Sequence, residues 1–337
     1  MTKPLVTICI PNYNNAKYID ACIQSALNQT YENIEIIFID DCSLDDSFSI
    51  AQKYSNKIKT YKNTTNIGQP KNTNKCIELS KGKYLVILHS DDQLLPNFAS
   101  ILVPLLEKYP NTGIAVGERM LTNEKNVITK IPPFYNINCI IPGLKQAKVF
   151  MMTSFLINQV LFRRDVFDKI GDIDERFIVN LDGLLWFKCA LQGDVAYIQK
   201  PVSIYRIHKE QITAKYNQTI NHMLEYHNTL TEMFKLAKGI LYLEQFFDDA
   251  VKRVGELTVR YCDDIIKNEN YDLAKRYLAL ATVFDPKIVN REHYKILKES
   301  LETNDVEPLK AYNKLIKNKN LINRKTSYSP PEGSIKI

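Results

Sequence analysis

The first 120 residues of this chain alternate short apolar runs with segments of helical periodicity, and this alternation limits the folds open to it. Several of the runs are apolar on both faces, as strands are when helices cover both sides of a parallel sheet. The predicted strands are residues 5–10, 34–39, 59–62, 84–88 and 113–116. The predicted helices are residues 16–29, 45–54, 72–79 and 96–109. Repeated strand–helix–strand order predicts an α/β fold with a mostly parallel, doubly wound sheet.

The rest of the chain changes character twice. Residues 118–148 are rich in Pro and Asn, and we expect them to form an irregular loop over the site. The next predicted elements are strands at 155–162 and 195–198 and a helix at 182–191. After Gln211 the pattern is almost entirely helical, and one stretch, 271–286, resembles a single tetratricopeptide-type hairpin without a regular repeat. We therefore predict three parts: an α/β domain at 1–212, a helical C-terminal domain at 213–320 and a polar tail at 321–337.

The composition, with 45% apolar and 24% charged residues, is that of an ordinary soluble globular protein. The first residues have the pattern of a strand and contain no secretory cleavage site. No apolar run reaches the roughly 18 residues that a membrane-spanning helix needs. Seven cysteines are scattered without metal-ligand spacing, so we expect reduced, buried thiols. These features predict a cytoplasmic protein.

The segment from Leu309 to Tyr328 contains six basic residues and no acidic one. Such a segment can lie on an anionic membrane surface or on nucleic acid, or it can be a solvated helix face followed by a frayed tail. Both interpretations stay open, so peripheral contact with the inner face of the membrane is a hypothesis, as is self-association through the helical region. Because the net charge is only +6, we expect no nucleic-acid partner.

Three polar clusters each follow a predicted strand. The clusters are Pro11-Asn12-Tyr13-Asn14, Asp40-Asp41-Cys42-Ser43 and His89-Ser90-Asp91-Asp92. In doubly wound sheets, ligands bind beyond the carboxyl ends of the strands. We therefore expect the three clusters to form one shared site.

Asp91 and Asp92 are adjacent carboxylates at a strand end, where they repel each other. A Mg²⁺ or Mn²⁺ ion relieves such repulsion and is typically bound by one or two carboxylates together with phosphate oxygens. The alternative is a surface turn in which Asp92 caps the following helix. Asp41 could accept a hydrogen bond from a nucleotide base or a ribose, and the alternative is a simple turn. Tyr13 could stack on the base, and the alternative is a core aromatic.

Longer segments carry a resemblance to a known family. The likeness begins in residues 6–47, VTICIPNYNNAKYIDACIQSALNQTYENIEIIFIDDCSLDDS, which resemble the opening of family 2 glycosyltransferases with the GT-A fold. It continues through Asn66-Ile67-Gly68, Asn74, Gly82-Lys83-Tyr84 and HSDDQLLP at 89–96. It resumes in FRRDVFDKIGDIDERF at 162–177, LDGLLW at 181–186 and YRIH at 205–208. The resemblance covers roughly the first 210 residues in the expected order, which makes the set of motifs specific.

The resemblance implies the inverting transfer of a sugar from a nucleotide-sugar donor to a hydroxyl acceptor. Pro11, Tyr13 and Asp41 would hold the base, most often uracil. Asp91 matches the metal-binding aspartate of the family, and Asp182 matches the general base that removes the acceptor proton. The remaining expected contacts are Asn12, Asn72, His89, Ser90 and Asp91 with the donor, Asp92 and His208 with the metal, and Asn158, Gln159 and Trp186 with the acceptor. The alternative for His208 is a satisfied or exposed histidine without a ligand.

Three positions depart from the family pattern. His89 stands where the family often has aspartate, and Leu181 stands where it has glutamate before the base. Cys42 replaces the usual glycine after the aspartate pair, which places a bulkier residue in that turn. Because Asp91 and Asp182 are retained, we expect an active enzyme.

The chain lacks the QxxRW signature of processive synthases, so we expect an enzyme that adds a single sugar. The resemblance implies a hexosyltransferase or N-acetylhexosaminyltransferase, with a UDP-sugar favoured as donor. The expected acceptor is a glycan or a lipid-linked precursor of a cell-surface polysaccharide. The alternative is a catalytically inactive, glycosyltransferase-like binding or scaffold protein, which the three departures favour. A dinucleotide-dependent oxidoreductase is disfavoured, because no G-x-G-x-x-G follows the first strand.

Overall fold

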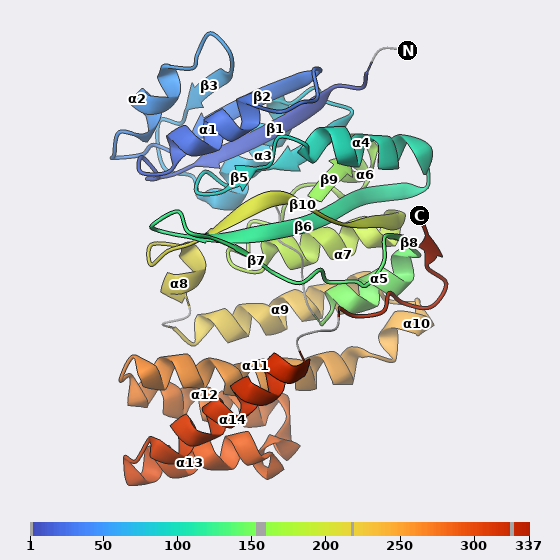
Figure 1. Ribbon diagram of the computed structural model, residues 1–337. Helices are drawn as coiled ribbons and strands as arrows, with labels where there is room; N and C mark the ends of the chain where they lie inside the picture. The colour runs from blue at the N-terminus through green and yellow to red at the C-terminus, as the bar shows by residue number, and fades with distance from the viewer. Residues whose placement is uncertain (1–2, 153–159, 217–218, 324–326) are drawn as a thin grey trace. The chain divides into compact units, whose positions relative to one another are not determined.

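The computed structural model describes residues 3–152, 160–216, 219–323 and 327–337 (Figure 1). Contacts divide the chain into two compact units. Unit 1 contains Met1–His208 and Tyr328–Ile337, and unit 2 contains Lys209–Ser327. All described strands belong to unit 1, which also contains every described residue of the three polar clusters.

The first part of the sheet in unit 1 is parallel. β1 (Val6–Asn12) pairs in parallel with β2 (Ile34–Asp40) on one side and with β4 (Tyr84–Ile87) on the other. β3 (Lys59–Lys62) pairs in parallel with β2 and forms that edge of the sheet. Every residue of β1 and β4 is buried, which agrees with strands covered on both faces.

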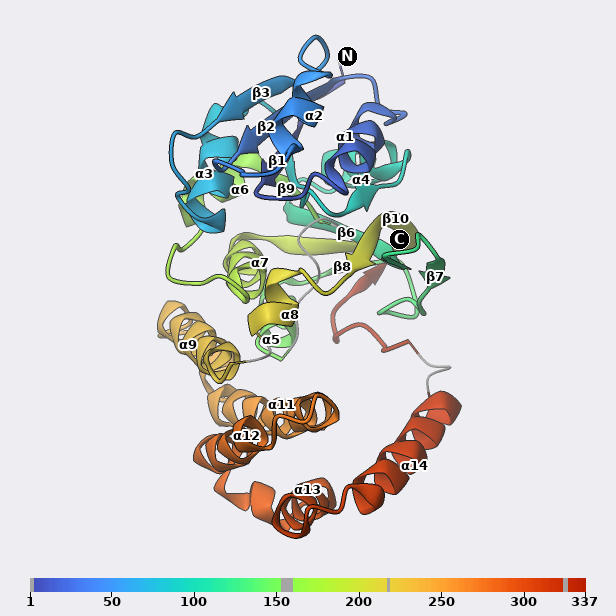
Figure 2. The same ribbon diagram turned by 90° about the vertical axis from the view of Figure 1, so that its left-hand side faces the viewer.

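Helices cover both faces of this parallel part (Figure 2). α1 (Ile19–Leu27) and α4 (Phe98–Lys108) lie on one face, and α3 (Gln69–Leu79) lies on the other. α2 (Ser47–Gln52) contacts α1. Apolar side chains of α1 and α4 form one buried cluster with those of β1, β2 and β4. The predicted doubly wound α/β fold is therefore confirmed.

The second part of the sheet mixes parallel and antiparallel pairs. β6 (Thr112–Asn123) and β10 (Asp194–Ile207) are long strands that pair in parallel. β9 (Val160–Arg163) pairs antiparallel with both β4 and β6 and so joins the two parts. α6 (Arg164–Ile170) follows β9 directly, and α7 (Leu181–Gln192) precedes β10. The strand order is β11-β8-β10-β6-β9-β4-β1-β2-β3.

The prediction of an irregular loop at 118–148 is wrong. The elements in this stretch are the end of β6, β7 (Ile128–Lys130), β8 (Cys139–Ile141) and α5 (Gly143–Phe150). A buried hydrogen-bond network fixes this stretch of chain. The Tyr197 hydroxyl donates to Glu118, and the Tyr135 backbone N–H donates to the Tyr197 oxygen. Strands of three residues depend on their sheet neighbours for stability, and local composition does not reveal those neighbours.

Residues 328–337 return to unit 1. β11 (Ile335–Lys336) pairs antiparallel with β8, and Tyr328 forms an isolated bridge with Tyr135. The sequence predicts only a polar tail at 321–337, but its last residues cover an edge that β8 would otherwise present unpaired. Backbone pairing, rather than side-chain polarity, determines the position of this segment.

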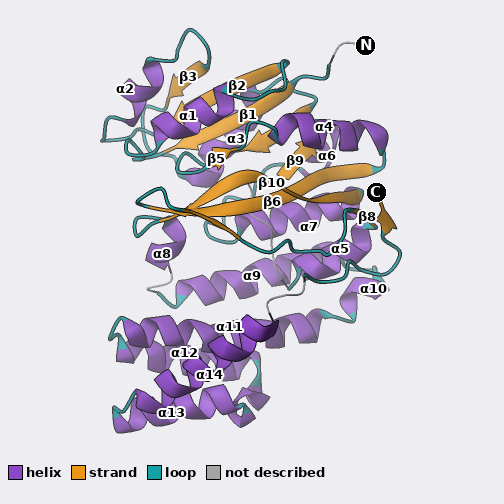
Figure 3. Cartoon of the chain, in the orientation of Figure 1, coloured by secondary structure: helices purple, strands orange, loops and turns teal. Residues whose placement is uncertain are grey.

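Unit 2 consists of helices joined by loops (Figure 3). Its described helices are α8 (Ile212–Tyr216), α9 (Asn221–Leu236), α10 (Leu241–Glu244), α11 (Phe247–Lys267), α12 (Tyr271–Phe284), the 3₁₀ helix Pro286–Asn290, α13 (Glu292–Thr303) and α14 (Glu307–Asn323). α11 and α12 pack against each other, and the Cys262 thiol donates to the Ala274 carbonyl oxygen across the pair. All seven cysteines are free thiols, as expected, and all but Cys42 are buried. Within the described parts of the chain, no helix is both long and apolar enough to cross a bilayer.

His222 in α9 is expected to make the stability of unit 2 depend on pH. Its side chain is 1% exposed and lies against Tyr226 and Tyr261, and burial lowers its pKa from 6.5 to about 4. Between pH 6.5 and about 4, this imidazole binds a proton in the unfolded chain but stays neutral in the folded chain. The free energy of unfolding should therefore fall as pH decreases, by at most about 1.4 kcal/mol per pH unit.

The measurement is urea unfolding of wild type and His222→Phe at about pH 7 and about pH 5. The phenylalanine keeps the ring contacts but cannot bind a proton, so its unfolding free energy should depend less on pH. An equal pH dependence in the two proteins would show that His222 is not responsible.

Candidate functional site

The three polar clusters meet beyond the carboxyl ends of β1, β2 and β4. Asn12 at the end of β1 pairs with Asp40 at the end of β2, and its Nδ2 donates to Asp40 Oδ1 over 2.8 Å. The Nδ2 of Asn15 donates to Ser90 Oγ over 2.7 Å, which joins the loop after β1 to the loop after β4. The structure thus brings the predicted clusters to one edge of the sheet.

The two aspartates after β2 differ in their surroundings. Asp40 is fully buried and is held by Asn12. Asp41 accepts hydrogen bonds at Oδ1 from Asn63 Nδ2 over 2.8 Å and at Oδ2 from the Gly68 N–H over 2.9 Å. Asp41 therefore shapes the loop between β3 and α3. Asp41 is itself only 2% exposed, and its Oδ1 also accepts from the Ile67 N–H over 2.9 Å. A carboxylate has about four acceptor positions, so three are filled and one remains for a donor on a base or ribose.

Five residues expected to touch the donor are buried: Pro11, Asn12, Asp41, Asn72 and Ser90. Asn72 donates from Nδ2 to the Ile39 carbonyl oxygen and accepts from Asn63 Nδ2, both over 3.0 Å. Asn72 therefore orients Asn63, which in turn contacts Asp41. At this position Asn72 supports the loop rather than forming its surface.

Cys42 has a φ of 60°, in the left-handed region that glycine adopts without strain. This conformation explains the glycine of the family pattern at the same turn. The backbone here is held from the loop after β1, because Asn14 Oδ1 accepts from the Leu44 N–H and the Asn14 N–H donates to Ser43 Oγ, both over 2.9 Å. The turn therefore keeps its shape around the larger cysteine side chain.

Tyr13 lies directly after β1 and is 45% exposed. The alternative that it is a core aromatic is therefore wrong. An exposed ring at the ligand-binding edge of the sheet can stack on a nucleobase.

Asp91 and Asp92 face different partners. Asp92 is 4% exposed, and its Oδ1 accepts from the backbone N–H of Arg206 over 2.8 Å. Burial and the neighbouring Asp91 raise the pKa of Asp92 well above its usual value. Asp91 Oδ2 lies 3.0 Å from His208 Nε2. The alternative that Asp92 caps a helix is wrong, because α4 has Asn97 as its N-cap residue.

β5 (Gln93–Leu94) explains why His208 lies beside Asp91. This short strand pairs antiparallel with β10, which places the residues before β5 next to those at the end of β10. The His208 ring also packs on Tyr18, with 4.8 Å between ring centroids. His89, two residues before Asp91, is partly buried, and burial lowers its pKa.

The donor atoms of Asp91 and His208 fit a divalent cation. Among the described residues there is no group of three or more His, Cys, Asp or Glu side chains placed to hold a metal. A carboxylate oxygen and an imidazole nitrogen are both ligands for Mn²⁺, and Mg²⁺ commonly takes one or two carboxylates together with substrate phosphates. Two protein ligands therefore suit a cation whose other positions are filled by a diphosphate and water.

Asp182 lies in the first turn of α7, where the Gly183 N–H donates to its Oδ1 over 2.8 Å. Arg119 on β6 is a buried basic residue that the sequence analysis did not single out. Burial lowers the pKa of Arg119, while the charges of Asp92 and Asp182 are among those that oppose this shift. Arg119 is thus within electrostatic reach of both acidic groups. No sequence signal pointed to it, because it falls in the stretch predicted as a loop.

The expected acceptor contacts are only partly visible. Asn158 and Gln159 lie outside the described residues. Trp186 is fully buried and packs on Phe162, with 6.0 Å between ring centroids. The expectation that Trp186 binds the acceptor is therefore wrong, because α7 directs it into the core.

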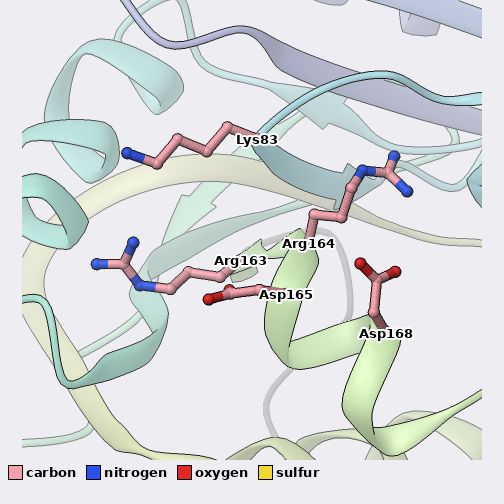
Figure 4. Close-up of a pocket in the computed structure, with 5 residues that line it drawn as sticks. All are labelled: Lys83, Arg163, Arg164, Asp165 and Asp168. Atoms are coloured by element: carbon pink, nitrogen blue, oxygen red, sulfur yellow. The ribbon is translucent and has the colours of Figure 1, made fainter.

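A pocket of about 320 Å³ lies elsewhere in unit 1 (Figure 4). Its lining residues are Lys83, Arg163, Arg164, Asp165 and Asp168. Lys83 immediately precedes β4, so the pocket lies at the amino end of that strand, whereas the polar clusters lie beyond its carboxyl end. Arg163 and Arg164 donate to the carbonyl oxygens of Thr112 and Gly82, respectively. This pocket is separate from the candidate site.

Part of unit 1 matches a family profile, and known proteins are similar to most of the chain. Residues 7–171 match the profile of the family described as glycosyl transferase family 2. The chain is 29% identical to the uncharacterized glycosyltransferase RP339 of Rickettsia prowazekii, over 88% of this chain and 90% of that protein. It is 32% identical to the uncharacterized glycosyltransferase RT0329 of Rickettsia typhi, over 66% of this chain and 70% of that protein.

A solved structure shows the same fold. The crystal structure of residues 1–349 of S. aureus TarS in complex with UDP-GlcNAc matches with a TM-score of 0.58 and 15% identity, covering 89% of this chain and 92% of that one. At this identity the likeness concerns the fold alone. Together with the family profile and the Rickettsia relatives, it leads to one assignment: the chain belongs to glycosyl transferase family 2 and is a glycosyltransferase with the GT-A fold.

Proposed function

We propose that the enzyme transfers a hexosyl or N-acetylhexosaminyl unit from a UDP-sugar to a hydroxyl group of an acceptor, with inversion at the anomeric carbon. The observation that carries this proposal is the 3.0 Å contact between Asp91 Oδ2 and His208 Nε2, at the edge where the polar clusters meet. The similar fold of TarS, whose structure contains UDP-GlcNAc, supports uridine diphosphate as the carrier.

The base would be bound by the loops after β1 and β2. Tyr13 offers an exposed ring for stacking, and Asp41 offers a carboxylate held rigidly by Asn63 and Gly68. A rigid carboxylate accepts the imino N–H of uracil without paying the entropy of ordering its own loop. His89 and Ser90 lie between these loops and Asp91, which suits contacts with the ribose or the diphosphate.

Asp91 and His208 would hold Mn²⁺ or Mg²⁺, with Asp92 fixing the turn from behind. Such an ion neutralises the negative charge that grows on a departing diphosphate. Because the His208 side chain is 2% exposed and that of Asp91 is 17% exposed, both groups are shielded from competing water.

Asp182 would take the proton of the acceptor hydroxyl while that oxygen bonds to the anomeric carbon. The bond between that carbon and the diphosphate oxygen breaks in the same step, so the configuration inverts. Arg119, within reach of both acidic groups, would place a positive charge near the transferred sugar. Because α7 and β6 hold these groups in fixed positions, less entropy is lost on reaching the transition state, and the reaction is faster.

We also propose a glycan or a lipid-linked precursor of a cell-surface polysaccharide as the acceptor. Seven free thiols suit a reducing compartment, which supports a cytoplasmic location. Exposed Lys310 and Lys314 on α14 support peripheral contact with an anionic membrane surface. Self-association through unit 2 is a further proposal.

A thermal-shift panel of nucleotides and nucleotide-sugars with Mn²⁺ tests the donor class. Uridine diphosphate and one UDP-sugar should raise the melting temperature most, because ligand binding stabilises the folded state by mass action. Tyr13→Ala should weaken UDP binding by roughly tenfold or more, since base stacking contributes about 1–3 kcal/mol. Tyr13→Phe keeps the ring and should bind UDP like wild type.

Tyr61→Ala provides the matched control. Tyr61 is also an exposed tyrosine, but it lies on the edge strand β3, so its loss should leave UDP affinity unchanged. A larger shift with a guanosine or thymidine diphosphate, or equal UDP binding by Tyr13→Ala and wild type, would refute the assignment of the base site.

A further inference from the structure

Arg206 holds both residues of the acidic turn. Its backbone N–H donates to Asp92 Oδ1 over 2.8 Å, and its side-chain Nε donates to the carbonyl oxygen of Asp91 over 3.0 Å. The residue is 2% exposed, so it cannot itself contact a substrate. One buried residue of β10 therefore holds both the backbone of Asp91 and the carboxylate of Asp92.

The same guanidinium also reaches the hairpin between β6 and β7. Its Nη1 donates to the Asn123 carbonyl oxygen over 3.1 Å and to Asn126 Oδ1 over 2.8 Å. Asn126 has a φ of 59°, so the hairpin presents this side chain from a left-handed residue. The fork of Arg206 thus connects two loops that come from different parts of the sheet.

Arg206 and His208 both pack on the ring of Tyr18. The guanidinium carbon of Arg206 lies 4.7 Å from the centroid of the Tyr18 ring, and the His208 ring lies 4.8 Å from the same ring. Arg206 is therefore bonded to the residue that carries one proposed metal ligand and packs on the ring that supports the other.

We propose that Arg206 is a positioning residue that sets the affinity of the Asp91–His208 pair for a divalent cation. The inference rests on the proposed function, since it concerns the same pair of ligands. Asp91 and Asp92 repel each other, and the bonds from Arg206 prevent the turn from opening to relieve that repulsion. Removing a residue that hydrogen-bonds to a metal ligand commonly weakens metal affinity about 10- to 100-fold.

The test is a titration of Mn²⁺ into the full chain at saturating UDP, with free Mn²⁺ followed by its EPR signal. Arg206→Met should weaken Mn²⁺ affinity about 10- to 100-fold. Arg206→Lys keeps the charge and one donor but loses the fork, so its affinity should lie between those of Arg206→Met and wild type. Turnover at saturating Mn²⁺ should recover much further than turnover at low Mn²⁺.

Two further variants make the result specific. Asn126→Gly keeps the left-handed hairpin but removes one acceptor of Arg206, and it should weaken Mn²⁺ binding about two- to tenfold. Arg163→Met is the matched control, because Arg163 also donates to a backbone carbonyl oxygen within the sheet but lies in the separate pocket of Figure 4. It should lower the melting temperature without changing Mn²⁺ affinity.

The outcomes separate the inference from the proposed function. Wild-type Mn²⁺ affinity in Arg206→Lys and Asn126→Gly overturns the inference and leaves the proposed metal site intact. If Arg206→Met does not fold, these two milder variants decide the result. Absence of Mn²⁺ binding by the wild-type chain with any nucleotide overturns the proposed metal site and the inference together.

Discussion

Replacing Asp182 by asparagine is expected to lower kcat about 10³-fold while the affinity for UDP stays at its wild-type value. A general base contributes about 10²- to 10⁴-fold to the rate of proton transfer, and an amide cannot take the acceptor proton. The amide oxygen of the new side chain would still accept from the Gly183 N–H, so the start of α7 should keep its structure. Turnover is measured by release of UDP from the donor, and affinity by thermal shift.

Asp165→Asn is the control for this substitution. Asp165 also lies in the first turn of a helix, α6, but it lines the pocket at the amino end of β4. Its replacement should leave kcat unchanged. Equal turnover in wild type and Asp182→Asn would remove Asp182 from the mechanism. Absence of donor turnover in the wild type would instead favour the alternative of a scaffold protein.

Replacing Asp91 by asparagine is expected to abolish detectable Mn²⁺ binding at saturating UDP and to lower kcat/KM about 10²-fold or more. The change removes the negative charge that faces His208, but the backbone carbonyl oxygen of Asp91 still accepts from Arg206. The turn should therefore persist without its metal-binding charge. Isothermal titration with Mn²⁺ and a Mn²⁺ dependence of turnover measure the effect.

Asp92→Asn in the same turn distinguishes the two aspartates. Because Asp92 Oδ1 accepts from the Arg206 N–H, an asparagine oxygen can replace it, and most of the Mn²⁺ affinity should remain. An equal loss in the two variants would return Asp92 to the ligand set predicted from the sequence. A normal Mn²⁺ dependence in Asp91→Asn would contradict the metal site itself.

Local patterns were sufficient for the parallel half of the sheet. The runs that became β1, β2 and β4 are apolar on both faces, and helical segments separate them, so period and order alone indicate the topology. Asp41 and Asp91 follow directly from this topology, because every parallel strand ends at the same edge. Asp182 was predicted from the family resemblance, since its helix alone does not distinguish it.

Residues 118–148 show where local patterns fail. β7 and β8 have three residues each, too few for a period to be recognised, and the backbone partner of β8 at residues 335–336 lies at the other end of the chain. The side of α7 on which Trp186 lies was also not evident, because the helix is apolar around most of its surface. Its position depends on neighbouring side chains such as Phe162 of β9.

The sequence therefore determined the class of fold and the edge of the sheet at which the candidate acidic residues lie, because these depend on short-range periodicity and strand order. Only the tertiary structure decided which atoms meet. Asp91 and His208 are 117 residues apart, Arg206 is bonded to both aspartates of the turn, and Arg119 lies near two of the site's carboxylates. Such contacts arise from the pairing of β5 with β10 and of β6 with β10, and distances between strands leave no periodic trace in the chain.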